Sequence, residues 1–191
     1  MLNHLDVWKR CEEIAPQLSR SLAEFEASHR DRNNSGSVEG AILTTWCLLI
    51  ADAKDRKVSL SSIYLSTLHS SLEGSDSIAF PAEFREGNSP EDWSTFLSGI
   101  HDANGESICG AEAWVLAQLS WGNHVPSMSF SLGWLAFNGL RLQEGLYPVC
   151  PPRQDSSRLA AALAAAGPPC WDSETLRELI GEYDRNQSPD A

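Results

Sequence analysis

The sequence lacks paired cysteines and the motifs that mark the commonest catalytic and cofactor sites. Its five cysteines are widely scattered and form no CxxC pair, so neither a disulfide framework nor a zinc site of the usual spacing is predicted. It contains no GxxxxGK[ST] loop, no GxGxxG fingerprint, no HExxH helix and no GxSxG elbow. We therefore expect no bound metal and no cofactor.

Long hydrophobic runs are also missing. The longest charge-free apolar stretch lies near residues 41–51 and is too short to cross a bilayer. The first residues show no basic segment followed by an apolar one, so no signal peptide is predicted. These absences lead us to expect a cytoplasmic protein with reduced thiols and no membrane partner.

Positive charge is scarce, especially in the second part of the chain. Fourteen Lys and Arg residues stand against 26 Asp and Glu residues, a net charge of −12. Charges nearly cancel in residues 1–60, whereas the stretch from Glu73 to Glu112 holds nine acids and one base, Arg85. Such a field repels nucleic-acid phosphates and attracts basic proteins. The sequence thus favours a basic protein partner over nucleic acid, although an acidic surface that only aids solubility is the alternative.

Helical periodicity covers most of the first 74 residues. Residues 3–31 form one pattern, in which Pro16 predicts a kink or two short helices meeting near Ala15. Residues 38–54 give the clearest helix, because one wide apolar face recurs at helical spacing, at Val38, Ala41, Ile42, Thr45, Trp46, Leu49, Ile50 and Ala53. We also expect Cys47 to be a small buried side chain. The next helix follows Ser59 and ends at Gly74, and it carries Leu60, Ile63, Tyr64, Leu68 and Leu72.

The densest apolar stretch, residues 107–145, is interrupted at residues 122–126 and predicts a central helical hairpin. Residues 147–153 are rich in proline and should lie extended across the surface, before two further helices. No repeat near 33–47 residues is visible, which argues against a solenoid. The sequence therefore predicts an all-α, single-domain bundle of seven or eight helices over residues 1–185. We also expect little or no strand, and a disordered tail at residues 186–191.

A weak catalytic hypothesis combines His101, Asp102 and Cys109. Cys109 is expected in the first turn of a helix, where the dipole lowers the pKa of a thiol. His101 ends the preceding helix, and Asp102 could orient its imidazole. No family-like signature surrounds Cys109, so a structural cysteine is the alternative. A small helical enzyme, or an apolar ligand pocket lined by tryptophans of the hairpin, is the corresponding second hypothesis for function.

The preferred hypothesis is a non-enzymatic, acidic protein-binding module that engages a basic partner surface. A toxin-neutralising immunity protein or a chaperone would suit it, because an acidic body can occlude a basic groove and associate rapidly. Two tryptophans at element ends could anchor the partner, or could equally cap the core. The predicted partner-binding residues are Glu73, Asp76, Glu83, Glu86, Glu91, Asp92, Trp121 and Trp171.

Overall fold

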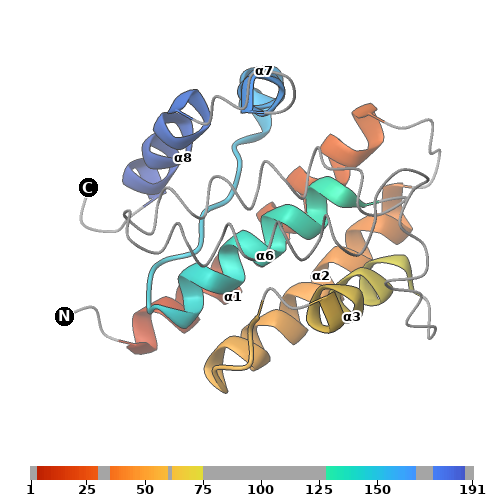
Figure 1. The fold of residues 1–191 in the computed structure, drawn as a ribbon, viewed down its shortest axis with the longest axis vertical. Helices are drawn as coiled ribbons and strands as arrows, with labels where there is room; N and C mark the ends of the chain where they lie inside the picture. The colour runs from red at the N-terminus through yellow and green to blue at the C-terminus, as the bar shows by residue number, and fades with distance from the viewer. Residues whose placement is uncertain (1–3, 30–34, 60–61, 75–127, 167–173, 188–191) are drawn as a thin grey trace.

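The computed structural model describes residues 4–29, 35–59, 62–74, 128–166 and 174–187 (Figure 1). These residues form helices and connecting segments without any strand, which confirms the all-α class. The elements are α1 (His4–His29), α2 (Ser35–Lys54), α3 (Ser62–Glu73), α6 (Ser129–Gln143), the short 3-10 helix η2 (Arg153–Asp155), α7 (Ser156–Ala166) and α8 (Glu174–Gln187). The described part thus holds six α-helices, against the seven or eight predicted for the whole chain.

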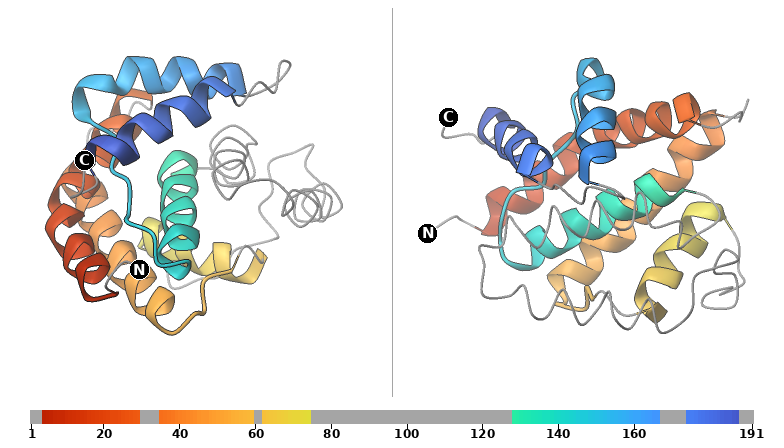
Figure 2. Two further views of the ribbon diagram at one scale, coloured as in Figure 1. Left: turned by 90° about the vertical axis from the view of Figure 1, so that its left-hand side faces the viewer. Right: turned by 45° about the horizontal axis from the view of Figure 1, so that its top comes forward.

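Helix α6 occupies the centre of the described structure. Figure 2 shows α1 and α2 on one side of it, with α3 at one end of this layer and α7 and α8 at the other. Every residue from Phe130 to Gly139 is buried, as expected for a helix with apolar side chains on all faces. The second half of the predicted hairpin is therefore confirmed as a core helix. Its first half, residues 107–127, lies outside the described residues.

Helices α1 and α2 pack against each other and against α6. The buried face of α1 repeats every three or four residues, at Val7, Cys11, Ile14, Leu18 and Leu22. In α2 the fully buried Trp46 donates its indole N–H to the carbonyl of Cys11 at 3.1 Å. The one polar atom of this large side chain is thereby satisfied inside the core.

A side chain of α1 also supports the start of α6. Met128, which precedes α6, makes no side-chain capping hydrogen bond. The buried carboxylate of Glu26 instead accepts a hydrogen bond from the backbone N–H of Ser131 at 2.9 Å. A negative group at this end of a helix satisfies a free amide and opposes the positive end of the helix dipole.

Pro16 does not divide the first helix. α1 is a single helix from His4 to His29 with Pro16 inside it, so the second of the two predicted alternatives, a pair of short helices, is wrong. Pro16 and Glu12 both face solvent, where water can hydrate the carbonyl that the proline leaves without an N–H donor.

One predicted side-chain position also needs correction: Cys47 is exposed rather than buried. The apolar face predicted for α2 by its spacing is confirmed, since Ile42, Thr45, Trp46, Leu49 and Ala53 are buried, and Cys47 lies outside that face. In α3 the buried face is formed by Leu65, Leu68 and Leu72, whereas Ile63 is 75% exposed. None of the described helices is both long enough and apolar enough to span a membrane.

The close approach of α6 to α2 depends on Gly139. A Cβ atom at this position would lie 2.8 Å from Leu49 Cδ1 and 3.0 Å from Val58 Cγ1. Leu49 and Val58 are themselves buried, so neither can move aside freely. Gly40, on the exposed face of α2, has nothing within 4 Å of the same position.

We expect Gly139→Ala to lower the free energy of unfolding by about 1–3 kcal/mol, because the added methyl group overpacks the contact between the two helices. The matched change Gly40→Ala should raise it by up to about 1 kcal/mol, since it only removes flexibility from an exposed helical position. Urea unfolding of both variants measures the difference. A Gly139→Ala protein as stable as the wild type would contradict the close contact.

Candidate functional site

The segment that follows α6 has no regular structure but is buried. Residues 146–152 are not helical, as their proline content predicts, yet Pro148, Val149, Cys150 and Pro151 are all buried. The expectation that this segment crosses the surface is therefore wrong. Backbone N–H and C=O groups inside a protein need partners, and the described part of the chain contains no strand that could supply them.

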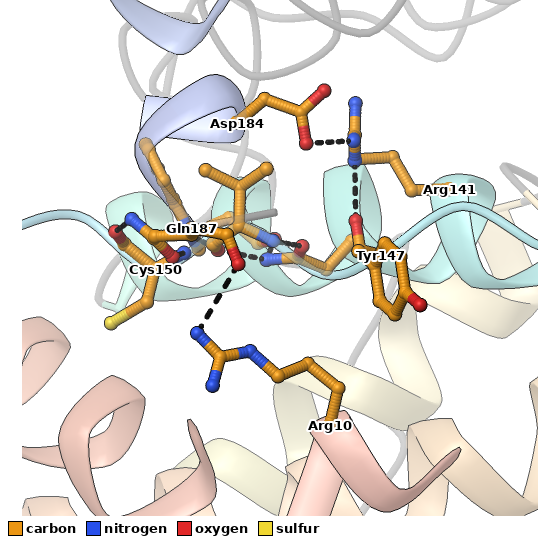
Figure 3. Close-up of polar contacts among 9 residues, drawn as sticks. Arg10, Arg141, Tyr147, Cys150, Asp184 and Gln187 are labelled. Atoms are coloured by element: carbon orange, nitrogen blue, oxygen red, sulfur yellow. Dashed lines mark hydrogen bonds and ion pairs between the residues drawn. The ribbon is translucent and has the colours of Figure 1, made fainter. Parts of the chain in front are cut away.

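Two side-chain amides provide these partners (Figure 3). Asn138 Oδ1 accepts a hydrogen bond from the N–H of Val149 at 2.7 Å, and Asn138 Nδ2 donates to the Val149 carbonyl at 3.0 Å. Gln187 Oε1 accepts from the N–H of Cys150 at 2.9 Å, and Gln187 Nε2 donates to the Cys150 carbonyl at 2.6 Å. We call Asn138 and Gln187 the amide clamp. Each amide binds both backbone groups of one residue, as an adjacent β-strand would.

Two arginines secure the surroundings of the amide clamp. Arg141 is only 3% exposed; its Nη2 lies 2.7 Å from Asp184 Oδ1, and its Nε donates to the Tyr147 carbonyl at 2.9 Å. Arg10 of α1 donates to the backbone carbonyl of Gln187 at 3.4 Å. Helices α1, α6 and α8 are therefore all joined around the buried segment (Figure 3).

The buried segment leads into the wall of a small pocket between α1 and the start of α7. This α1–α7 pocket has a volume of about 190 Å³. One face of α1 lines it with Ser21, Glu24, Phe25 and Ser28, and the opposite wall consists of Pro151, Pro152, Arg153, Ser156 and Leu159. The clamp thus fixes the position of one wall against the other.

The α1–α7 pocket combines an apolar interior with an ion pair at its rim. Phe25 stacks on Phe130 with ring centroids 3.7 Å apart, and Leu159 is buried. Arg153 donates two hydrogen bonds to the Glu24 carboxylate, from Nε at 2.7 Å and from Nη2. The side chains of Arg153 and Glu24 are 52% and 46% exposed, so this pair remains accessible to a ligand.

Most of the predicted site residues fall outside the described structure. This applies to the catalytic set of His101, Asp102 and Cys109. It applies equally to the partner-binding residues Asp76, Glu83, Glu86, Glu91, Asp92, Trp121 and Trp171. Glu73 is described and ends α3 with its side chain exposed. Among the described residues, no group of three or more His, Cys, Asp or Glu side chains could hold a metal ion.

Sequence reasoning missed Asn138, Gln187 and the α1–α7 pocket. Asn138 was detectable, because it is a polar residue within the apolar run from Phe130 to Leu142. A buried asparagine needs hydrogen-bond partners and therefore indicates a nearby backbone or polar group. Gln187 gave no such signal, since it lies among polar residues in sequence.

The described cysteines differ sharply in their expected reactivity. Burial raises the pKa of the Cys11 thiol from 9.0 to about 12. The Cys150 thiol is likewise raised to a pKa of about 12 by burial, which outweighs the opposing effects of Ser21 and Arg10. Neither thiol ionises appreciably at neutral pH, whereas Cys47 is exposed.

No model of a known protein family matches the chain, and comparison with curated proteins gives no significant match.

Gln187→Ala should lower the free energy of unfolding by about 1–3 kcal/mol, because both polar backbone groups of Cys150 lose their partners in a partly buried place. Asn186→Ala is the matched control, since Asn186 is the exposed neighbour on the same helix. Hydrogen exchange provides a second measurement, in which the Cys150 amide should lose protection only in the Gln187 variant. Equal stability of the two variants would contradict the clamp.

In the folded protein at pH 7, a disulfide reagent should modify Cys47 rapidly and modify Cys11 and Cys150 only after unfolding. Peptide mapping after brief labelling identifies the modified cysteines. Among Cys11, Cys47 and Cys150, Cys47→Ser should remove the rapid phase of the labelling reaction. The same experiment tests the catalytic hypothesis. A Cys109 that reacts at pH 6 faster than the exposed Cys47 would support a nucleophile, and a slower one would contradict it.

Proposed function

We propose that this protein is a non-enzymatic module that binds a basic surface of a partner protein. The distribution of charge supports the proposal. The described residues carry 15 acidic and 11 basic side chains, whereas the other residues carry 11 acidic and three basic ones. Between residues 75 and 127 alone there are eight acids and one base. The negative surplus is thus concentrated in one stretch of the chain.

Many acids of the described helices are compensated locally by arginine. Arg153 pairs with Glu24, Arg158 with Glu182 and Arg141 with Asp184. The first two of these pairs use two guanidinium nitrogens each, a geometry that strengthens and orients the contact. The described helices therefore add little to the negative electrostatic field of the protein. The stretch from Glu73 to Glu112, in contrast, contains a single base, Arg85, against its nine acids.

An excess of one sign in one stretch suits electrostatic steering. Complementary charge raises the rate of encounter with a basic protein and disfavours acidic partners, including nucleic acid. A compact helical protein of this kind suits the role of a toxin-neutralising immunity protein or a chaperone that covers a basic groove. In this proposal the protein acts in the cytoplasm and needs no cofactor.

Association with the partner should weaken at least about tenfold between about 50 mM and about 500 mM salt, because added ions screen exposed charges. The partner is first captured from the native cell, then purified and titrated at both salt concentrations. Equal affinities, or a captured partner without an excess of basic residues, would contradict the proposal.

A pair of charge-matched variants tests which part of the chain gives the salt-dependent affinity. Asp76→Asn, Glu83→Gln, Glu86→Gln and Glu91→Gln together remove four charges from the acidic stretch. Four exposed acids of the described helices and turns give the control: Asp6→Asn, Glu12→Gln, Glu144→Gln and Glu178→Gln. The first variant should lose most of the salt-dependent affinity and the control should retain it. An equal loss of affinity in both variants would show that only the net charge of the protein matters, and not the position of the acidic stretch.

A further inference from the structure

The solvent side of helices α2 and α3 carries no charge over most of its length. Neither residues 40–51 of α2 nor residues 62–72 of α3 include an Asp, Glu, Lys or Arg, although 21% of the chain is charged. The two helices pack against each other (Figure 1), whereas the exposed sides of α1 and α8 carry charges of both signs. We call the exposed residues of these two segments the α2–α3 face: Gly40, Leu43, Thr44, Cys47, Leu48, Ala51, Ile63 and Thr67.

The α2–α3 face also holds the exposed large apolar side chains of the described residues. Leu43, Leu48 and Ile63 are 39%, 36% and 75% exposed, and no other large apolar side chain of the described part is exposed. Single exposed apolar residues are ordinary on a protein surface. Three of them on two neighbouring, uncharged helices form a patch of the kind that marks an interaction site.

Two hydrogen bonds fix the register of α2 and α3. Tyr64 donates its hydroxyl to Asp52 Oδ2 at 3.1 Å, and Thr45 donates to Ser71 Oγ at 2.8 Å. The earlier residue of α3 thus meets the later residue of α2, so the two helices run antiparallel. Leu48, which lies halfway between the two α2 residues, is level with the middle of α3. The exposed residues of both helices therefore form one continuous surface.

The hydroxyl groups of the α2–α3 face have hydrogen-bond acceptors within the protein. Thr44 donates its hydroxyl to the Gly40 carbonyl at 3.0 Å, and Thr67 donates to the Ile63 carbonyl at 3.0 Å. Burial of a hydroxyl group is unfavourable when it loses its hydrogen bond to water without replacement. Because these two hydroxyls would keep their present bonds, another apolar surface can cover the face with little loss of hydrogen bonding.

We propose that the α2–α3 face binds the same face of a second copy of this chain. An uncharged face gives a basic partner no carboxylate to pair with, whereas across a two-fold axis it meets only uncharged residues of its own kind. Two copies carry −12 each and repel one another. Contact through the α2–α3 face brings no two charged side chains of these segments together, so it is the approach that costs the least repulsion among the described helices.

The size of the α2–α3 face indicates a weak dimer. The α2 segment from Gly40 to Ala51 is about 17 Å long, and two packed helices are about 20 Å wide because their axes lie about 8–10 Å apart. The face therefore covers roughly 350 Å², less than the roughly 800 Å² that each partner of a stable complex buries. We expect a concentration-dependent dimer with a dissociation constant of about 10 μM or more.

Sedimentation velocity of the full chain alone, at concentrations from about 10 μM to about 1 mM, measures this dimer. Raising the salt from about 50 mM to about 500 mM should lower the dissociation constant at least about twofold, because added ions screen the repulsion between the copies. Association with the proposed basic partner has the opposite salt dependence, so the two interactions are distinguishable and either proposal can fail alone. A dimer that weakens as salt rises would indicate charge pairing and overturn the inference.

Two variants of equal charge test the position of the contact. Leu48→Glu with Ile63→Glu places one carboxylate on each helix of the face and should weaken the dimer at least about tenfold, because like charges then meet at the interface. Gln17→Glu with Gln154→Glu adds the same charge at exposed positions of α1 and η2 and should weaken it no more than about twofold. Circular dichroism checks that both variants are folded. Equal weakening would overturn the inference.

Cys47 reports on the same contact in the unchanged protein, because it is exposed within the α2–α3 face. A short bismaleimide, to which one thiol adds at each end, should join two chains through Cys47, and peptide mapping identifies the linked residues. Cross-links through Cys109 or Cys170 alone would place the contact elsewhere and overturn the inference. A chain that remains monomeric at about 1 mM would do the same. If such a monomer captures another protein that the Leu48 and Ile63 variant does not, the face belongs to that protein instead.

Discussion

A buried segment of backbone, which no strand accompanies among the described residues, is the constraint on which the described structure depends. Val149 and Cys150 lie inside the protein, where each unpaired N–H or C=O would cost about as much as a lost hydrogen bond. Asn138 and Gln187 meet this requirement because a primary amide carries an acceptor oxygen and a donor N–H side by side, so that one side chain can pair with both the N–H and the C=O of one residue. The all-α fold thereby accommodates a strand-like segment without a sheet.

This arrangement links the core to the α1–α7 pocket. The clamp holds Val149 and Cys150, and the next residues, Pro151, Pro152 and Arg153, form one wall of the pocket. The position of that wall is therefore fixed by hydrogen bonds made inside the protein.

Parts of this structure could be predicted from the sequence, and the reasons differ by element. The buried residues of α8, Leu176, Leu179, Ile180 and Tyr183, recur at helical spacing, and polar residues mark its outer face. The buried face of α2 also falls at the predicted spacing, although Leu43 on its outer side is apolar too. In α3 the exposed Ile63 is apolar, so the sequence did not mark the outer face. The clamp could not be derived, because its partners lie 11 and 37 residues apart and meet only through tertiary packing. The pocket could not be derived for the same reason, because it lies between α1 and residues 151–159.

The hydrogen bond between Arg10 and Gln187 joins residues that are 177 positions apart. Contacts between such distant positions form slowly, because the entropy of closing a long loop is lost before the contact contributes. We therefore infer that docking of α8 on the buried segment is a late step of folding. Gln187 would then act chiefly on the rate of unfolding, because interactions absent from the folding transition state slow the escape from the native state and hardly change the rate of reaching it.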